Sequence, residues 1–537
     1  MNAFRAALLQ QLDRHFDVLV VGGGIIGSAI ALESARRGLS VVLAERGDFS
    51  SGTSSRSSKL VHGGLRYLKD GHLRLTMESV RERDALKREA KGLVEPQSFL
   101  LALYPNRKPG KLTFKLGLLI FDAIGRKRTS KSHSARAADL IAPHLDQRQL
   151  QGGMQYWDAT TDDARLVLRV LQEAEAAGAT VINYCSADGL LEENGKVVGA
   201  EVRDVETQQR YRIAATVVVN ATGAWADQLR GQLGAPAKIR PLRGSHLVFP
   251  LWRFPVGQGL SIFHPHDGRP VFVYPWEGVA LLGTTDVDHS DGMDQEPRVT
   301  PEEAAYLLAA ASHQFPSLDI KLEDAISAFA GVRPVIGSGR ADPSKESRDH
   351  LILVEHGLIT VTGGKLTTFR PIALAALRAI TQALGVKLDL GWGPVFTSCS
   401  EAGLPSGMPE SVQQRLMGRH GGRLSAVLPA DDERDFQLIA ESDTYWIELR
   451  IAARDKSVVH LDDLLLRRTR LGILLREGGR VLLPLIRDYV QTDLGWSDAL
   501  WETEVDRYLS IWRRFYSVPS TIPAIEPYLR TKEMVTT

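Results

Sequence analysis

The stretch from Asp17 to Glu45 constrains the fold more than any other part of this chain. An apolar, β-branched run of strand length, 17–21, leads into the pattern Gly22-x-Gly24-x-x-Gly27, an Ala-rich helical pattern and a second apolar run, 41–43. In a βαβ unit these three glycines allow a tight turn, close approach of the backbone to a pyrophosphate, and close packing of helix on strand. Glu45 closes the second strand, where a carboxylate can accept hydrogen bonds from the hydroxyls of a ribose. The stretch therefore predicts a dinucleotide-binding unit, because a glycine-rich turn alone needs none of this context.

The segment after Glu45 distinguishes a flavin domain from a nicotinamide domain. A nicotinamide domain normally continues into another regular βα unit, whereas residues 52–68 are rich in hydroxyls and glycines and end in His62-Gly63-Gly64-Leu65-Arg66-Tyr67-Leu68. Such a segment can lie along an extended cofactor, and a flexible Ser/Gly linker does not need this mixture of residues. Residues 57–68 closely resemble the flavin-contacting region of the FAD-dependent glycerol-3-phosphate dehydrogenases.

The resemblance covers nearly the whole chain, from Asp17 to about Gly472. Further similar motifs follow in the order of that family: Asn220-Ala221-Thr222-Gly223-Ala224-Trp225, Arg243-Gly244-Ser245-His246-Leu247-Val248, Pro275-Trp276, Gly283-Thr284-Thr285-Asp286, Gly331-Val332-Arg333-Pro334, Gly363-Gly364-Lys365-Leu366-Thr367-Thr368 and the helical run Leu461–Arg470. Residues 1–15 and those after about Ser517 lie outside the resemblance.

FAD is the cofactor that the resemblance implies. Carried over motif by motif, the expected cofactor contacts are Gly22, Gly24, Gly27, Glu45, Arg46, Thr53, Ser54, Ser57, Ser58, Lys59, Leu60, His62, Gly63, Gly64, Ala187, Thr222, Gly223, Gly364, Lys365, Leu366 and Thr367.

The resemblance also implies a phosphorylated substrate. A phosphate carries nearly two negative charges, so several cations or N–H groups must converge on it. The expected binding residues are Arg66, Tyr67, Arg333, Arg348, Lys365 and Thr368. Arg348 is also compatible with an ordinary solvated surface position.

Hydride transfer from a C–OH group also needs a group that accepts the hydroxyl proton. His62 and His246 both lie in motifs of the resemblance, and an imidazole has a suitable pKa. Either histidine can equally serve to bind backbone or flavin, so the base stays open between them. Arg333 completes the set of expected catalytic residues.

The activity that follows from the resemblance is oxidation of sn-glycerol 3-phosphate to dihydroxyacetone phosphate. Hydride would pass to flavin N5 and electrons onward to a membrane quinone. An oxidase that uses oxygen, and a relative that acts on amines or other hydroxy acids, remain alternatives, because no motif identifies the electron acceptor. A flavin-binding protein without activity is disfavoured by the retained set of cations.

The predicted fold class is α/β followed by α. A doubly wound FAD-binding domain is expected in three segments, 17–95, 158–233 and 339–390, with a connecting segment at 96–157. An antiparallel substrate cap is expected as an insertion at 234–338, and a helical domain at 397–520. Within these, we expect a helix over 158–175 and a hairpin that turns at Asn194-Gly195.

Composition favours an enzyme over a nucleic-acid-binding protein. The 537 residues carry a net charge of only +1, and no basic block suggests a nucleic-acid partner. Cys185 and Cys399 are too few for a disulfide framework, which suits a reducing cytoplasm. Neither a CxxC pair nor HExxH occurs, so no metal is expected.

Peripheral contact with the inner face of the cytoplasmic membrane is expected from residues 108–128. No run of about 18 apolar residues is present, so no membrane span is predicted. The apolar run 116–121 has basic flanks, as in an interfacial helix. A core helix with solvated ends fits the pattern equally well, and the resemblance favours the membrane, since quinone-reducing members of that family work there. A homodimer is compatible with the sequence.

Overall fold

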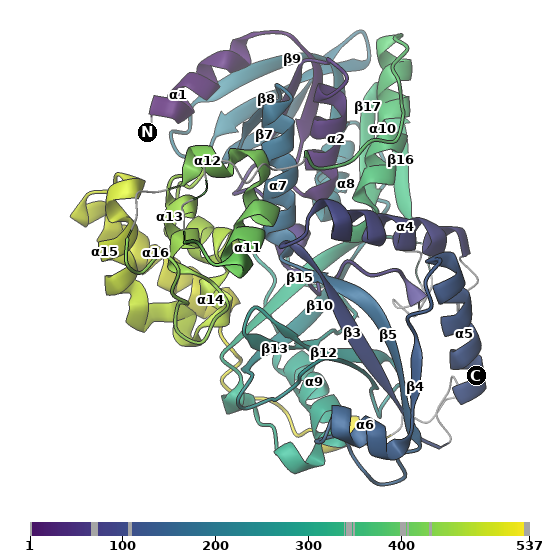
Figure 1. Cartoon of the computed structure of the whole chain (residues 1–537). Helices are drawn as coiled ribbons and strands as arrows, with labels where there is room; N and C mark the ends of the chain where they lie inside the picture. The colour runs from purple at the N-terminus through teal and green to yellow at the C-terminus, as the bar shows by residue number, and fades with distance from the viewer. Residues whose placement is uncertain are drawn as a thin grey trace.

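The computed structural model describes residues 3–65, 73–105, 110–337, 339, 346, 349–397, 404, 407–428 and 432–530. Two β-sheets form its upper and lower parts, and helices from the C-terminal region cover one side of both (Figure 1). The structure has the predicted arrangement of an α/β domain, a mostly antiparallel cap and a helical C-terminal part.

The upper sheet contains the predicted βαβ unit. β1 (Phe16–Val21) pairs in parallel with β2 (Val41–Ala44) and with β9 (Arg210–Asn220). The strand order is β16-β17-β9-β1-β2-β6, and β7 and β8 join through β9. The remaining strands are β6 (Thr180–Ile182), β7 (Cys185–Glu193), β8 (Lys196–Asp204), β16 (His350–Glu355) and β17 (Leu358–Gly363). The hairpin between β7 and β8 turns at Asn194-Gly195 as predicted, with both residues at positive φ.

Helices bury the faces of this sheet, which explains why its parallel strands are continuous apolar runs. α2 (Ile25–Ala35), α7 (Asp163–Ala176) and α10 (Phe369–Leu384) share one hydrophobic core with β1, β2 and β9. On the other face, α1 (Ala3–Gln10) and the turn after it contribute Leu9 and Leu12 to a second core. α8 (Ala226–Gln232) follows β9.

The lower sheet, called the cap sheet below, has the order β14-β10-β13-β12-β11-β3-β5-β4, with β15 also paired to β10. The expected insertion supplies β10 (Ile239–Pro250), β11 (Gly259–Phe263), β12 (Pro270–Trp276), β13 (Val279–Gly283), β14 (Val287–Asp288) and β15 (Ser327–Ile336). α9 (Pro301–Gln314) and α6 (Ala135–Ile141) pack against this sheet.

The segment 96–157, expected to be a connector, contains strands of the cap sheet. β5 (Gly152–Thr161) pairs in antiparallel fashion with β3 (Val94–Leu103) and with β4 (Lys131–His133), and β3 pairs in parallel with β11. The helix expected from Asp158 begins only at Asp163, because 158–161 complete β5 and the Asp162 side chain caps α7 by accepting from the N–H of Arg165 (3.2 Å).

The helical C-terminal region is confirmed. Its elements are α11 (Glu410–His420), α12 (Leu424–Val427), α13 (Trp446–Ala453), the π-helix η9 (Asp463–Arg468), α14 (Leu471–Leu474), α15 (Leu483–Leu494), α16 (Asp498–Phe515) and α17 (Glu526–Leu529). Their aromatic core continues into the cap sheet through residues such as Trp276.

Two further helices, α4 (Leu73–Glu89) and α5 (Lys111–Ile124), lie on the opposite side of the molecule (Figure 1). Within the described ranges, no helix has the length and apolar character needed to cross a membrane.

Candidate active site

The glycine pattern after β1 forms a turn into which side chains would not fit. Gly22 has φ +113°, and a Cβ added to it would lie 2.6 Å from the carbonyl oxygen of Ala221. A Cβ on Gly27 would lie 1.9 Å from the carbonyl oxygen of Gly22. Gly24 is the N-cap of α2, and the Ile25 N–H donates to Ser54 Oγ (3.0 Å). The start of α2 is therefore packed directly on the turn, and its N-terminal end faces the space where a pyrophosphate would bind.

Glu45 follows β2 and lies beside this turn. Its carboxylate accepts the N–H groups of Gly23 (2.7 Å) and Gly47 (2.9 Å). Burial raises the pKa of Glu45, and the two backbone N–H groups oppose that shift. A carboxylate can accept about four hydrogen bonds, so two acceptor positions remain for the hydroxyls of a ribose.

The hydroxyl-rich loop after Glu45 runs along the cap. Thr53 Oγ1 donates to the Val332 carbonyl oxygen (2.5 Å), and Ser58 Oγ lies 2.9 Å from His246 Nε2. Ser57 binds Asp163 Oδ2 through its N–H (2.9 Å) and its hydroxyl (2.7 Å). The hydroxyls of Ser57 and Ser58 thus bind protein groups here, which leaves the backbone for contact with a cofactor.

Lys59 was expected at the cofactor, but its side chain points into the protein. Its fully buried ammonium donates to Asp163 Oδ1 (2.9 Å) and to the carbonyl oxygen of Ser55 (2.5 Å). Burial, and then the nearby charge of Arg470, lower the pKa of Lys59 to about 7 despite Asp163. The Lys59 side chain therefore stabilises the loop from the protein side, by linking Ser55 to Asp163.

Two further turns complete the site. The Thr222 hydroxyl donates to Asn220 Oδ1 (2.7 Å), and Thr362 Oγ1 donates to the Gly223 carbonyl oxygen (2.9 Å). Two hydrogen bonds join His62 to Thr367. The His62 N–H donates to Thr367 Oγ1 (3.1 Å), and the Thr367 hydroxyl donates to the His62 carbonyl oxygen (3.3 Å). We call the space bordered by the turns at 22–27, 222–223 and 363–368 and the loop 52–64 the cofactor cradle.

The other residues expected to contact the cofactor have the following neighbours in the structure. Gly63 donates its N–H to Asp158 Oδ1 (2.7 Å), and Leu60 pairs with Thr160 of β5. Arg46 stacks on the indole of Trp225 at 4.6 Å, and Ala187 lies in β7 opposite Val202. Gly64 follows Gly63, while Gly364, Leu366 and Lys365 belong to the last turn, whose Thr368 donates its N–H to the Lys365 carbonyl oxygen (3.2 Å).

The cap sheet presents His246 and Arg333 on one face. In the register of β10 and β15, Gly244 lies opposite Gly331 and His246 lies opposite Phe329. Because every second residue of a strand points to the same face, Arg333, two residues after Gly331, lies on the face that carries His246. A Cβ on Gly244 would lie 2.1 Å from Arg333 Nη2, and one on Gly283 would lie 2.2 Å from His246 Cδ2. These glycines make room for the side chains of Arg333 and His246.

Arg333 and His246 differ in character. The Arg333 side chain is a quarter exposed, and its guanidinium donates to Thr284 Oγ1 (2.9 Å) and Asp286 Oδ1 (3.2 Å). His246 is buried and stacks on Phe329 with ring centroids 4.7 Å apart. Burial, followed by the charges of Arg333 and Lys59, lowers the pKa of His246 well below 6.5, so its imidazole is neutral.

Three of the expected substrate-binding residues, Arg66, Tyr67 and Arg348, lie outside the described residues. The described residues do connect the cap to the last turn of the cradle. A Cβ on Gly363 would lie 3.4 Å from the side chain of Ile336, at the end of β15, and Lys365 follows two residues later.

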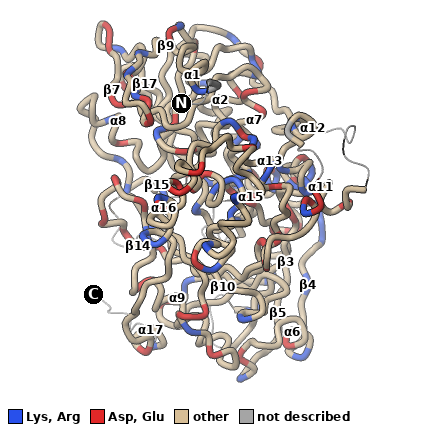
Figure 2. The backbone as a smooth tube through the Cα atoms, turned by 90° about the vertical axis from the view of Figure 1, so that its left-hand side faces the viewer, with Lys and Arg blue, Asp and Glu red and all other residues tan. Residues whose placement is uncertain are grey.

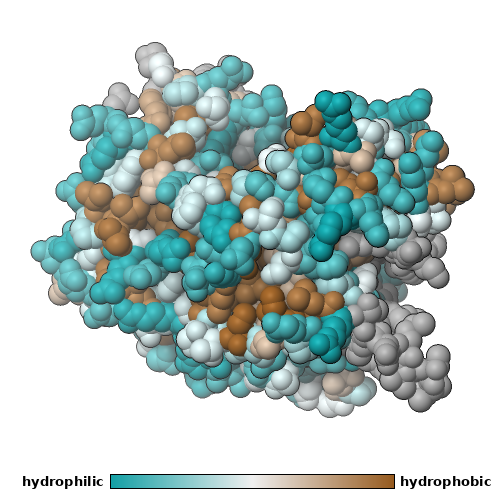
Figure 3. Space-filling view, turned by 90° about the horizontal axis from the view of Figure 1, so that it is seen from below, coloured by the Kyte–Doolittle hydropathy of each residue, from teal (hydrophilic) through white to brown (hydrophobic). Residues whose placement is uncertain are grey.

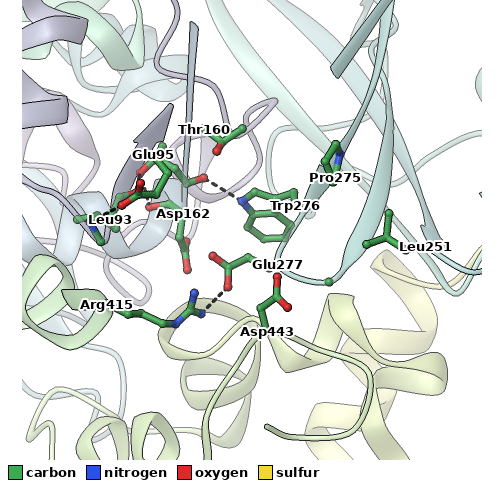
Figure 4. Close-up of a pocket in the computed structure, with 13 residues that line it drawn as sticks. Leu93, Glu95, Thr160, Asp162, Leu251, Pro275, Trp276, Glu277, Arg415 and Asp443 are labelled. Carbon is green, nitrogen blue, oxygen red and sulfur yellow. Dashed lines mark hydrogen bonds and ion pairs between the residues drawn. The ribbon is translucent and has the colours of Figure 1, made fainter. Parts of the chain in front are cut away.

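A cavity of about 170 Å³ lies away from the cradle, between the cap sheet and the C-terminal helices, and none of the expected site residues lines it. Figure 4 shows the carboxylates of Asp162, Glu277 and Asp443 turned toward this space, with Arg415 bonded to Glu277. Burial alone would raise the pKa of Glu277, but Arg415 and Arg419 lower it to about 2. The cavity therefore belongs to an ion-paired junction between cap and helices.

The cradle fits FAD better than a metal. Side-chain-free turns, a helix N-terminus and a partly buried carboxylate are the groups that a pyrophosphate and a ribose require. His, Cys, Asp and Glu side chains in the described ranges form no group that could hold a metal ion.

Two site residues were missed in the sequence. Asp163 binds Ser57 and Lys59, and Asp48 is bound by Arg467 and Arg468, far along the chain. Two sequence features could have indicated these residues, namely the carboxylate pair Asp162-Asp163 at the start of α7 and the arginine pair Arg467-Arg468.

Comparison with known proteins identifies the family. Residues 17–370 match the family described as FAD dependent oxidoreductase, and residues 373–500 match the C-terminal domain of alpha-glycerophosphate oxidase. The aerobic glycerol-3-phosphate dehydrogenase of Bacillus subtilis is 34% identical over 447 residues, which cover 78% of this chain and 80% of that protein. Its namesake in Staphylococcus saprophyticus is 38% identical over 395 residues, or 72% of this chain and 70% of the relative.

A solved structure supports the same assignment. The glycerol-3-phosphate dehydrogenase from Bacillus halodurans complexed with FAD is 27% identical and aligns with a TM-score of 0.74, covering 94% of this chain and 97% of that one. The chain therefore belongs to the FAD-dependent oxidoreductase family, in the group that contains the aerobic glycerol-3-phosphate dehydrogenases, and its cofactor is FAD.

Proposed function

We propose that this protein oxidises the C2 hydroxyl of sn-glycerol 3-phosphate to the ketone of dihydroxyacetone phosphate. The observation that carries the proposal is the face of the cap sheet on which Arg333 and His246 lie together, since its strand β15 is bonded to the cradle loop through Val332 and Thr53. The names of the curated relatives point to the same substrate.

Arg333 and Lys365 are the proposed phosphate ligands within the described part of the chain. The Arg333 side chain is a quarter exposed, and bonds to Thr284, Thr285 and Asp286 hold its guanidinium in place. A planar, permanently charged guanidinium matches the geometry of phosphate oxygens. Thr368 adds a neutral donor in the same turn as Lys365. The motifs add Arg66, Tyr67 and Arg348.

FAD, when bound, supplies the hydride acceptor at flavin N5. The chain's own task is to orient the C2–H bond and to accept the hydroxyl proton. His246 is held neutral by burial. Its Nε2 faces Ser58 Oγ, and its Nδ1 is buried without a hydrogen-bond partner among the residues that the structure describes. The backbone N–H of His62 is hydrogen-bonded to Thr367 in the last turn of the cradle, which fixes the position of the His62 Cα atom. Both remain the candidate bases, and Arg333 would balance the negative charge that develops on the oxygen.

A screen of reductants tests the substrate. With a soluble dye as acceptor, we expect turnover with sn-glycerol 3-phosphate and negligible turnover with glycerol, glycine, proline or 2-hydroxy acids. Turnover with an amino acid or hydroxy acid, and none with sn-glycerol 3-phosphate, would contradict the proposal.

We propose that the electrons pass to a quinone at the inner face of the cytoplasmic membrane. α5 supports this placement, because Leu112, Leu116, Leu119 and Ile120 recur on one helix face and are 80%, 59%, 45% and 41% exposed. Leu118 and Phe121 of the same helix instead pack inside the protein. Apolar residues, in brown, lie at several places among hydrophilic ones on the face seen from below (Figure 3).

The charge around this helix face suits an anionic membrane. Five basic residues around this helix face are exposed: Lys111, Lys115, Arg126, Lys127 and Arg128.

If a quinone is the electron acceptor, a quinone analogue should reoxidise the reduced enzyme faster than oxygen does. Faster reaction with oxygen, with peroxide as the product, would identify the oxidase alternative instead.

A further inference from the structure

The motif Leu461–Arg470 has no role in the proposed chemistry, although every one of its residues is buried. It lies in the C-terminal helical region, contains the whole of η9 and ends just before α14. Three of its side chains, those of Arg467, Arg468 and Arg470, leave this region and reach the loop that follows Glu45.

The first end of that loop is held at Asp48. Arg468 binds Asp48 in a bidentate manner, through Nη1 (2.6 Å) and Nη2 (2.9 Å), and Arg467 Nε adds a third bond (2.5 Å). Asn183 Nδ2 donates to Asp48 Oδ1 (3.0 Å). Burial would raise the pKa of Asp48, but Arg468 and Arg467 lower it to about 2, so this carboxylate stays charged.

The second end is held at Ser55 and Asp163. Arg470 Nη2 donates to the carbonyl oxygen of Ser55 (2.6 Å) and to Asp163 Oδ1 (3.1 Å). Asp163 in turn binds the backbone and hydroxyl of Ser57 and the ammonium of Lys59. The three arginines therefore fix the loop at both of its ends.

Between these two ends, the loop forms one wall of the cofactor cradle. Ser50 donates its N–H to the carbonyl oxygen of Gly23 (3.1 Å), within the pyrophosphate turn. Ser54 Oγ caps the N–H of Ile25 at the start of α2 (3.0 Å). A displacement of the loop would thus move the groups that face the pyrophosphate.

We infer that the C-terminal helical region is a clamp for FAD, in which Arg467, Arg468 and Arg470 position the loop 46–59 in its cofactor-binding conformation. These arginines are positioning residues that act through Asp48, Ser55 and Asp163. Because coupling between two equilibria is reciprocal, FAD must also stabilise the docking of the helical region on the loop. This inference concerns the cofactor and does not depend on the identity of the substrate.

Conservative variants with a matched control test the clamp. Arg468→Lys and Arg470→Lys keep a positive charge but remove the forked contact. Arg415→Lys is the control, because Arg415 is also an ion-paired arginine of the helical region with little exposure (16%), yet it pairs with Glu277 of the cap junction and with Glu448. FAD Kd is measured by titrating apoprotein and following flavin fluorescence, and Tm is measured with and without FAD.

We expect Arg468→Lys and Arg470→Lys each to raise the FAD Kd at least tenfold and to reduce the rise in Tm caused by FAD. Arg415→Lys should leave the Kd within twofold of wild type, whatever its effect on Tm. Asp48→Asn changes the loop side of the same contact and should raise the Kd in the same way. An unchanged Kd in the clamp variants, or an equal increase in Arg415→Lys, would overturn the inference.

Discussion

Glu45 links the pyrophosphate turn to the site expected for the adenosine ribose, because its carboxylate binds the N–H groups of Gly23 and Gly47. Loss of a charge-assisted hydrogen bond costs about 1.5–3 kcal/mol. Glu45→Ala should therefore raise the FAD Kd by about 10- to 100-fold, since 1.4 kcal/mol is a factor of ten, while relative rates among substrates stay unchanged. Dialysis followed by flavin absorbance measures retention, with Glu193→Ala, at an exposed end of β7, as control. Full retention of FAD by Glu45→Ala would contradict the assignment.

Arg333 and Lys365 provide a test of phosphate recognition. Arg333→Ala and Lys365→Ala should each lower kcat/KM for sn-glycerol 3-phosphate by about 10- to 100-fold, the value of one charged hydrogen bond. Any residual oxidation of glycerol, which has no phosphate, should change little.

The control for Arg333 is Arg269→Ala, because Arg269 pairs with the same carboxylate of Asp286 (3.3 Å). If Arg333 only neutralised Asp286, Arg269→Ala would cause a similar loss. Equal losses on glycerol and on sn-glycerol 3-phosphate would mean that Arg333 and Lys365 support the fold or the flavin instead.

Residues whose role is local could be predicted from the sequence. Gly22 and Gly27 meet their constraints within the same βαβ unit, so their spacing alone indicated a turn without side chains. The role of the Lys59 side chain could not be predicted, because its partner Asp163 lies 104 residues away. A Ser/Lys-rich loop has the same local pattern whether its side chains face a cofactor or the protein.

At the scale of elements, α5 shows how one helix can divide its apolar residues between two surroundings. Phe121 packs so closely on the loop that a Cβ on Gly63 would lie 2.5 Å from its ring. The opposite face exposes Leu112, Leu116 and Leu119. The sequence indicated an apolar helix with basic flanks, but the direction of each side chain depends on contacts with distant segments.

Neutralising the cations around α5 tests the proposed membrane contact. Changing Lys111, Lys115, Arg126, Lys127 and Arg128 to Gln should release the protein from anionic vesicles, because each cation contributes roughly 1 kcal/mol near such a surface. The dye-linked activity and FAD content should survive, since these residues lie outside the cofactor cradle.

Vesicle co-sedimentation measures the effect. The control replaces five exposed cations on other elements with Gln, namely Lys196, Arg212, Lys321, Arg378 and Lys387, and should still bind. High salt should weaken binding of the wild type. If wild type and the α5 variant sediment alike, the exposed face of α5 does not contact the membrane.

The pairing partners of the strands in the cap sheet could not be predicted from the sequence. β3 and β5 are separated in sequence by α5 and α6, and their antiparallel register places them in the cap sheet. The apolar run 99–103 was visible, but a strand's partners are not encoded in its own pattern. The helical C-terminal region was easier to predict, because its periodicity is local.

At the scale of the whole molecule, buried and half-buried ion pairs join the three parts of the fold. Lys/Arg segments, in blue, and Asp/Glu segments, in red, lie close together around α13, α15 and α16 (Figure 2). His460 is one such link, with Nε2 3.2 Å from Glu206, after β8, and Nδ1 3.0 Å from Glu504 of α16. Burial alone would lower the pKa of His460, but these two carboxylates raise it to about 10.

This pKa shift predicts a dependence of stability on pH. A histidine whose folded pKa exceeds its ordinary 6.5 contributes stability that is fully present below pH 6.5 and is lost as pH rises through about 10. The difference in free energy of unfolding between wild type and His460→Gln should thus shrink over this range, on the order of 2 kcal/mol after allowance for solvent screening.

Denaturant titrations at several pH values measure that difference. His420→Gln is the control, because burial and then neighbouring arginines hold the pKa of His420 well below 6.5, so its contribution should not change above that pH. A constant difference between wild type and His460→Gln from pH 6.5 to 10 would show that the link carries no proton-dependent stability.

Anaerobic addition of sn-glycerol 3-phosphate to the FAD-loaded protein tests the central claim most directly. We predict that the oxidised flavin absorbance bleaches completely and that one dihydroxyacetone phosphate forms for each flavin reduced, while glycerol leaves the spectrum unchanged at the same concentration. A flavin that stays oxidised with sn-glycerol 3-phosphate, yet bleaches with an amine or another hydroxy acid, would contradict the account.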